Sequence, residues 1–296
     1  MAAVLYEPAF ATLARWFIRY RRRALTLLTL FGGLASVIFT PLTHWLIERY
    51  GWRDGVAILA LILGVVTVPL HGLILRSDPR EIGALPDGID ATTGAQAGRP
   101  VEENRTVTEV LRELPFWALT GALTLNAFCA AAISVHLIPY LISSGYEAGF
   151  AAAVAGLVGA MQLPGRLLFA PLGRGLEQRR LAMAVFAGQG GALLILSAAS
   201  GPAAVIAFVI IFGMSNGMTT LLRAALVAEL YGAARYGSLS GVISLFSTSA
   251  RALAPIAAGL LYTLWGGYRP VLWLLCLIAL AALLPAGLVT RRLQLS

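Results

Sequence analysis

The chain has 296 residues, of which 58% are hydrophobic and only 12% are charged, and its mean hydropathy is +0.80. A soluble domain is roughly half apolar and about a quarter charged, so this composition excludes an ordinary soluble protein and indicates a membrane protein. The formal net charge of +8 comes from 22 arginines, since the chain contains no lysine. These arginines alternate with apolar runs, so membrane topology explains them, and we expect no nucleic-acid partner.

The chain begins with a short apolar segment and continues with eight long ones. Residues 1–14 are too short to cross a bilayer and lack the basic start and cleavage site of a signal peptide, so we interpret them as the second half of a helix. The longer runs approach or exceed the roughly 20 residues that a membrane-spanning helix needs, and they lack the two-residue alternation of barrel strands. The predicted fold class is therefore an all-α polytopic membrane protein. The runs lie at 24–47, 55–75, 115–142, 149–172, 181–199, 203–228, 238–264 and 270–290.

The segments between these runs predict the orientation. Sixteen arginines lie beside one set of helix ends, whereas only Arg49, Arg53 and Arg269 lie beside the other set. The positive-inside rule then predicts a multi-pass protein of the inner (plasma) membrane with its C-terminus in the cytoplasm. The stretch 77–106 is rich in Gly, Pro and acidic residues and predicts a flexible cytoplasmic connection, and 107–115 predicts a short amphipathic helix.

A weak internal repeat relates two parts of the chain at a shift of 214 residues. In both copies a half-span leads into a basic loop, a Pro-containing span and a Gly-aromatic-Arg turn, "GWR" at 51–53 and "GYR" at 267–269. Parallel repeats of this size are typical of transporters built from two similar halves. On this reading about a hundred residues, or three and a half helices, precede the present start in a complete protein, so we expect an N-terminally truncated chain.

Four stretches carry a resemblance to a known family: "LYEPAFATLARWFIRYRRRALT", "GGLASVIFTPLTHWLIERYGWR", "VHLIPYLISSGYEAGFAAAVAGLVGAMQLPGRLLFAPLGR" and "GMSNGMTTLLRAALVAELYGAARYGSLSG". They resemble the fourth, fifth, seventh to eighth, and tenth to eleventh helices of the major facilitator superfamily, in the style of its bacterial monocarboxylate-transporter-like members. The resemblance implies that 1–76 is the remainder of an N-terminal half with part of helix 4 and helices 5 and 6. It makes 77–114 a cytoplasmic linker and 115–296 a complete C-terminal bundle of helices 7 to 12, with the first three helices missing.

The sequence departs from that family's motifs at two places, and both bear on the expected transport function. The family's basic loop after the eighth helix carries an Asp three residues before its Gly-Arg, whereas Ala170 precedes Gly173-Arg174 here, so a gating salt bridge through that Asp is in doubt. The Gly-Pro pair of drug antiporters is absent from the fifth helix, because Pro41 follows Thr40. The sequence therefore favours drug export less than the transport of another small solute.

Polar residues inside the spans share helical faces. Ser240, Ser244, Ser247 and Arg251 form one stripe, and Arg251 lies at mid-depth, where a charge normally faces a wet cavity or a partner. We take Arg251 as the first candidate for contact with substrate. The full candidate set for substrate binding is Arg251, Arg166, Asn126, His136, Tyr140, Gln162, Asn216 and Arg223.

Each candidate has a structural alternative. Arg166 and Arg223 could extend toward the cytoplasmic surface or pair with Glu177 or Glu229. Arg251 could form a buried structural pair, His136 could be a core histidine bonded to a neighbouring helix rather than a proton carrier, and the two Asn amides could join helices. Gly213 and Gly217, in a GxxxG spacing, predict close helix packing, and Cys129 and Cys276 predict core filling.

The residues exclude several enzyme classes. No phosphate-binding glycine loop, Ser-His-Asp set or metal-ligand spacing is present in the sequence, so we expect neither a catalytic site nor a metal or other cofactor. We predict a secondary transporter that moves a small solute, an organic anion such as a monocarboxylate, by alternating access, and we expect a monomer. A symporter coupled to protons is one form of such a transporter, and the sequence leaves symport or antiport and the coupling ion open. We expect the solute to be an anion because three arginines lie within the predicted spans, whereas few acidic residues do. The alternatives are a truncated membrane remnant that does not transport, and a drug-efflux member of the family.

Overall fold

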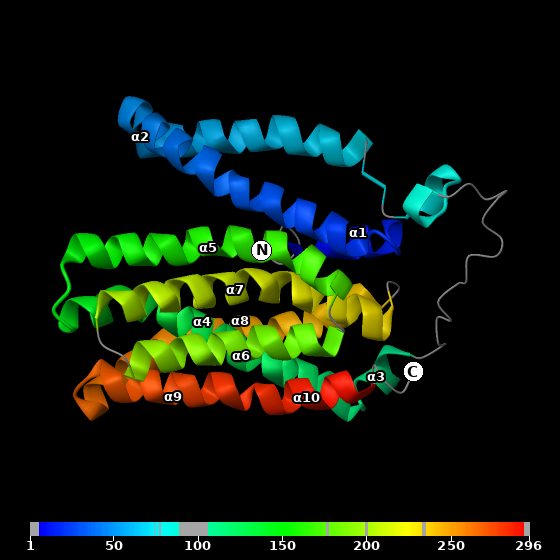
Figure 1. Cartoon of the computed structure of the whole chain (residues 1–296). Helices are drawn as coiled ribbons and strands as arrows, with labels where there is room; N and C mark the ends of the chain where they lie inside the picture. Colours follow the sequence, from blue (N-terminus) through cyan, green and yellow to red (C-terminus); the bar gives the residue numbers. More distant parts are fainter. Residues whose placement is uncertain are drawn as a thin grey trace. The chain divides into compact units, whose positions relative to one another are not determined.

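The computed structural model describes residues 6–73, 75–76, 78–88, 106–175, 178–198, 201–232 and 235–292, apart from the side chains of 6–7, 33–37, 40–41, 44, 174–175, 178–179 and 288–292. All regular structure in these residues is helical, as the fold class predicted (Figure 1). The chain divides into two compact units, Pro8–Gly98 and Arg99–Ser296, the latter including Met1–Glu7. The division into two transporter halves with 77–114 as a linker stays a prediction.

The Pro8–Gly98 unit contains α2 (Arg21–Leu73) and all of α1 (Tyr6–Trp16) except its first two residues. α1 confirms the helix expected near the start of the chain. α2 is broken at Gly51, whose φ of 79° and ψ of 167° leave the helical region, so it comprises two helices that meet at the "GWR" turn. These two parts contain the apolar run 24–47 and the run 55–75 up to Leu73.

The first part of the 77–106 segment is more structured than its composition indicated. Two short 3-10 helices, η2 (Pro79–Ile82) and η3 (Pro86–Gly88), follow α2. The side chain of Asp87 accepts hydrogen bonds from the backbone amides of Ile18 and Arg19 at 3.1 and 2.8 Å and, at 3.4 Å, from that of Tyr20. The indole of Trp16 donates to the carbonyl of Arg76 at 3.0 Å. Residues 89–105 lie outside the described ranges.

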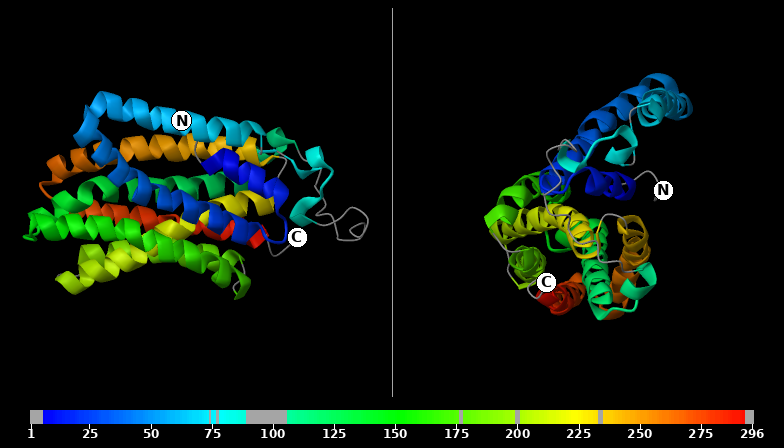
Figure 2. Two further views of the ribbon diagram at one scale, coloured as in Figure 1. Left: turned by 90° about the horizontal axis from the view of Figure 1, so that it is seen from above. Right: turned by 90° about the vertical axis from the view of Figure 1, so that its right-hand side faces the viewer.

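The other unit is a bundle of long helices. It comprises α3 (Val107–Val110), α4 (Leu114–Ser143), α5 (Ala148–Gly175), α6 (Gln178–Ala198), α7 (Pro202–Tyr231), α8 (Tyr236–Trp265), α9 (Tyr268–Ala281) and α10 (Leu283–Arg292). The right-hand view of Figure 2 looks along these helices. The expected amphipathic helix at 107–115 is only the single turn α3, whose Thr106 and Glu109 form a capping box.

The ends of the helices follow local chemistry. Pro115 and Pro202 lie in the first turns of α4 and α7, where a missing N–H costs no hydrogen bond. α8 ends at Trp265 and is capped by Gly266, which has a φ of 69° and directly precedes "GYR" at 267–269, whereas the break in α2 falls on Gly51, the first residue of "GWR". Both sequences lie at breaks between helices, and the 214-residue repeat stays a prediction.

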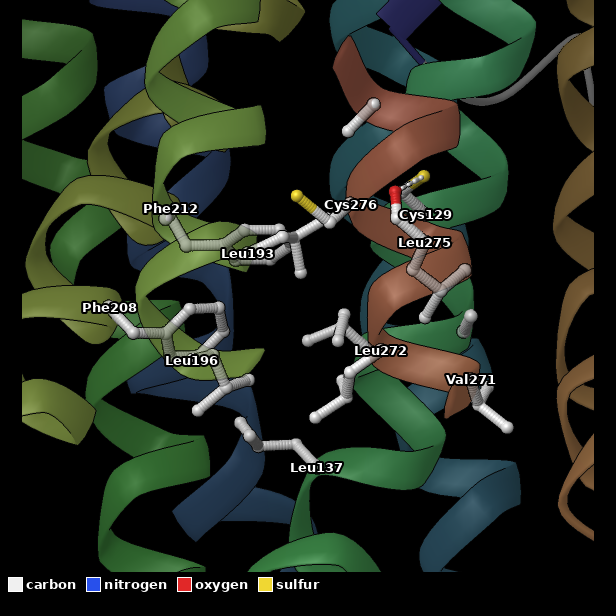
Figure 3. Close-up of a cluster of buried hydrophobic side chains, with 14 of the residues drawn as sticks. Cys129, Leu137, Leu193, Leu196, Phe208, Phe212, Val271, Leu272, Leu275 and Cys276 are labelled. Atoms are coloured by element: carbon white, nitrogen blue, oxygen red, sulfur yellow. Dashed lines mark hydrogen bonds between the residues drawn. The ribbon is translucent and has the colours of Figure 1, made fainter. Parts of the chain in front are cut away.

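The core of the bundle is apolar and includes both cysteines. Figure 3 shows side chains from α4, α6, α7 and α9 that meet around Leu193, Phe212, Leu272 and Leu275. Cys129 and Cys276 are fully buried in this cluster, which confirms that they fill the core. The Cys129 thiol donates to the Leu275 carbonyl at 3.4 Å.

Seven helical segments of the described residues are long and apolar enough to cross a membrane. They match seven of the eight predicted spans, and the remaining run, 24–47, belongs to α2, where several side chains are not described. The seven segments are Trp45–Leu73, Leu114–Ser143, Ala148–Gly173, Arg180–Ala198, Pro202–Tyr231, Tyr236–Trp265 and Tyr268–Gly287.

Candidate functional site

The surface of α8 divides into three lengthwise sectors when successive residues are placed 100° apart. One sector is buried against the bundle. A second is exposed and apolar, and consists of Leu245, Phe246, Leu253, Ile256, Leu260 and Leu264. The third is exposed or half-buried and made of small or polar residues: Gly237, Gly241, Ser244, Thr248, Arg251 and Tyr262. We call this third set the polar sector of α8; its composition does not suit contact with lipid tails.

Arg251 lies at the midpoint of α8, on the polar sector. Its side chain is exposed, and it has no hydrogen bond or ion pair within the part of the chain that the structure describes. The proposed alternative of a buried structural pair therefore finds no support among the described residues. Of the predicted serine stripe, Ser240 and Ser247 are buried and Ser244 is half-buried, so Arg251 is its most accessible member.

Arg223 reaches α8 from α7. One of its terminal nitrogens, Nη2, donates to the Ser244 hydroxyl at 2.5 Å, to the Ser240 carbonyl at 3.3 Å and to the Ser240 hydroxyl at 3.4 Å. Ser240 and Ser244 precede Arg251 by about three turns and two turns of helix, respectively. The first half of the serine stripe therefore serves as the acceptor for a second arginine, an arrangement that the sequence pattern did not reveal.

His136 reaches α8 from α4. Its Nε2 lies 2.9 Å from the carbonyl oxygen of Pro255 and its Nδ1 lies 3.3 Å from the hydroxyl of Tyr268. Because a carbonyl can only accept, Nε2 carries a proton, and in the neutral ring Nδ1 accepts from Tyr268. The ring lies against Gly259, where a Cβ would make an ordinary van der Waals contact of 3.7 Å with its Cε1. These are the bonds expected of a histidine that joins neighbouring helices.

Three tyrosines surround this contact near the turn between α8 and α9. Tyr140 lies one turn beyond His136 on α4, and its hydroxyl donates to the Leu196 carbonyl of α6 at 3.2 Å. The ring of Tyr268 lies 4.3 Å from that of Tyr262 and 6.2 Å from that of Tyr140, centroid to centroid. Sequence reasoning missed Tyr262 and Tyr268, although the "GYR" turn that places Tyr268 was evident.

Gln162 and Arg166 lie one turn apart on α5, as predicted. The Gln162 side-chain carbonyl accepts from Arg166 Nη2 at 3.4 Å. The backbone of Gln162 packs closely on α7, because a Cβ at Gly217 would lie 2.3 Å from the Gln162 carbonyl oxygen. Gly213 makes a similar approach to Met161, so the predicted role of Gly213 and Gly217 in close packing is confirmed.

The two candidate asparagines, Asn126 and Asn216, are less closely linked to the other candidate residues. Asn216 is half-buried near the midpoint of α7, next to Gly217 and so beside the contact with α5. Asn126 is 5% exposed in the core-facing part of α4, and within the described residues its amide makes no hydrogen bond to the other candidates. The structure thus joins Arg223 and His136 to α8, and Gln162 to Arg166, but it does not bring all eight candidates into one cluster.

A further polar residue was missed entirely. Gln189 of α6 is 1% exposed, and neither atom of its amide has a hydrogen-bond partner in the described part of the chain. It was detectable as the single amide in the apolar run "AVFAGQGGALLIL". Among the described residues, no group of three His, Cys, Asp or Glu side chains comes together as a metal site would require.

A bundle of apolar helices with an arginine at half its depth, on a sector made mostly of small and polar residues, is typical of a membrane protein whose helices surround a polar path or binding site. Comparison with known proteins identifies the class more closely. The Major Facilitator Superfamily profile matches residues 1–255, and the chain belongs to this family of membrane transporters, which is not a family of enzymes.

Curated relatives agree with this assignment, and a solved structure shares the fold. Monocarboxylate transporter 13 of Bos taurus is 28% identical over 268 residues, which cover 90% of this chain and 59% of that protein. Monocarboxylate transporter 12 of Rattus norvegicus is 25% identical over 300 residues, covering 93% and 60%. The E. coli fucose:proton symporter FucP superposes with a TM-score of 0.70 at 15% identity, covering 97% of this chain and 72% of that one. The chain spans about three fifths of the length of these curated relatives.

Proposed function

We propose that the chain acts in the secondary transport of a small organic anion, such as a monocarboxylate, across a membrane by alternating access. The observation that carries this proposal is Arg251, a charged, exposed and unpartnered side chain among the described residues at the midpoint of α8. A charge at the bilayer centre costs at least about 2.5 to 3.5 kcal/mol on insertion scales. A carboxylate that forms a charge-assisted, two-pronged pair with the guanidinium would offset this cost.

The remaining candidates take positions around Arg251. Gln162 and Arg166 on α5, with Asn216 on α7, would contribute a second polar surface near mid-depth. Arg223, held by the α8 serines, would add positive potential on the inner side. His136 and Tyr140 would limit the site on the outer side, and Asn126 would support α4 from within the bundle. The names of the relatives, monocarboxylate transporters, support an anionic solute.

Coupling to protons would use His136. The neutral ring accepts from Tyr268, and a protonated ring would donate to the same hydroxyl while Nε2 keeps its bond to Pro255, because a tyrosine hydroxyl can both donate and accept. His136 can therefore change its charge without losing either bond. The structural relative FucP is itself a proton symporter by name. We further propose a monomer in the plasma membrane with a cytoplasmic C-terminus.

Binding of a matched acid and amide tests the proposal. Lactate and lactamide differ in charge but little in shape, and we expect the purified chain to bind lactate about tenfold to a hundredfold more tightly by calorimetry, the value of a charge-assisted hydrogen bond of about 1.5 to 3 kcal/mol. Arg251→Gln should remove this preference, and Arg251→Lys should restore part of it, since it keeps the charge but not the fork. The exposed Arg112 provides the control, as Arg112→Gln should retain the preference.

Two results would count against the proposal. Equal binding of lactate and lactamide would refute an anion site, and an undiminished preference in Arg251→Gln would make Arg251 structural. Absence of binding to either compound, in a chain that is folded and inserted, would favour the alternative of a membrane protein that does not transport. Tight binding of large apolar cations instead would favour drug export.

A further inference from the structure

A shallow hollow of about 680 Å³ lies where α8 ends and α9 begins. It is lined by Trp265, Arg269, Pro270, Trp273, Leu274 and Leu277. We call it the α8–α9 groove. It is separate from the polar sector of α8, because none of its lining residues belongs to the candidate substrate site.

The lining residues change in character along α9. Arg269, Trp273 and Leu277 follow one another at intervals of four residues, so they lie along one face of the helix, and a rise of about 1.5 Å per residue separates the first from the last by about 12 Å. The charge of Arg269 lies at the end of the helix, the aromatic ring of Trp273 comes next, and the aliphatic side chain of Leu277 lies farther along. This order matches the headgroup, interface and hydrocarbon layers of a bilayer leaflet.

Arg269 is the only charged residue that lines the groove. Its side chain is exposed and makes no hydrogen bond, ion pair or ring contact in the described part of the chain. The other two arginines expected at this end of the helices differ, because Arg49 stacks over Trp45 at 5.9 Å and Arg53 over Trp52 at 5.1 Å. Arg269 therefore has a full charge beside an apolar hollow, and the complementary ligand is an amphiphile with a negative headgroup.

We propose that the α8–α9 groove binds one anionic phospholipid, with a phosphate oxygen on the Arg269 guanidinium and an acyl chain along Trp273 and Leu277. A soluble anion would gain the charge interaction but not the apolar contact, and a zwitterionic lipid would gain the apolar contact with a weaker net charge interaction. The proposal requires only that these helices cross a membrane, and it is independent of the transported solute.

One residue that lines the groove is the sequence neighbour of a residue that contacts the interior of the bundle. Tyr268, the residue before Arg269, bonds to His136 from the same first turn of α9. A lipid bound at Arg269 would hold this turn in place and so favour the contact between α9, α4 and α8. Anionic lipid would thereby stabilise one arrangement of the helices that carry the candidate site.

Quenching by brominated lipids tests the groove in the full chain. The protein would be placed in nanodiscs containing a small fraction of brominated phosphatidylglycerol or brominated phosphatidylcholine in a zwitterionic background, and tryptophan fluorescence recorded. We expect the anionic lipid to occupy the groove about fivefold more strongly, the contribution of one arginine near a lipid surface. Its excess quenching should vanish in a variant carrying both Trp265→Phe and Trp273→Phe, which removes the reporters and not the charge.

Two charge variants decide whether Arg269 is responsible. Arg269→Gln should abolish the excess quenching by the anionic lipid, whereas Arg53→Gln, which removes an arginine outside the groove, should leave it unchanged. Equal quenching by the two lipids, or an excess that survives Arg269→Gln, would overturn the proposal. Inorganic phosphate added to saturation should not reduce the excess, and full competition by phosphate would show an anion site without a lipid chain, which also contradicts it.

Discussion

Single glycines determine how closely α5 and α7 approach. A Cβ at Gly165 would lie 2.2 Å from the carbonyl oxygen of Met214, and neighbouring backbone atoms of Met214 lie within 3 Å. Backbone cannot move aside as a flexible side chain can, so even a methyl group requires the two helices to separate. Gly159 lies on the same helix, but a Cβ there would meet nothing within 4 Å. The two glycines form a matched pair for testing this contact.

Gly165→Ala should lower the free energy of unfolding by about 1 to 3 kcal/mol, the usual cost of overpacking a closely packed contact. Gly159→Ala should change it little or raise it slightly, because alanine favours the helix and fills open space. Thermal unfolding of the purified variants in one detergent measures both. Similar stability in the two variants would show that α5 and α7 are farther apart than the structure places them.

At the scale of elements, Asp87 connects the segment after α2 to the turn between α1 and α2. Its carboxylate accepts from three successive backbone amides, and its φ of 63° is unusual for a residue with a side chain. Asp tolerates this left-handed conformation better than most residues, and the amides that precede α2 favour a negative group. Such a contact fixes the start of a segment that its composition alone would describe as flexible.

Asp87→Ala should free the amides of Ile18, Arg19 and Tyr20. Hydrogen bonds to a charged group contribute about 1.5 to 3 kcal/mol, so exchange of these amides with deuterium should accelerate about tenfold to a hundredfold. Asp54, which is exposed on α2, supplies the control, as Asp54→Ala should leave these three amides unchanged. Unaltered exchange in Asp87→Ala would mean that the segment 78–88 is not held by this residue in solution.

For the whole molecule, the distribution of arginine predicts the orientation. Sixteen arginines lie beside one set of helix ends and three beside the other, so the first set should remain on the cytoplasmic side. A phosphatase that is active only outside the cytoplasm, fused after Ser296, should therefore remain inactive, while a fluorescent protein that folds only inside should be bright. The reverse pattern of the two reporters would invert the topology and with it the inner and outer ends assigned to the candidate site.

The sequence by itself determined the class of molecule and the order of its parts. Hydrophobic runs predict spans because the bilayer leaves backbone groups no partner but the same helix, and the breaks at Gly51 and Gly266 follow from conformations that glycine adopts readily. Helical periodicity also placed Ser244 and Arg251 on one face, but it did not separate them from Ser240 and Ser247 of the predicted stripe, which are buried. The family followed from extended similarity, and the comparisons bear it out.

Tertiary structure alone decided which polar residues meet. His136 and Tyr268 are separated by 132 residues and Arg223 and Ser244 by 21, and helical periodicity relates only residues of the same helix. The same holds for Gly165 against Met214 and for Asp87 against the turn at 18–20, where the acceptor lies in a segment without apolar periodicity. Contacts between elements depend on how the helices pack, and that packing is set by all of their side chains together.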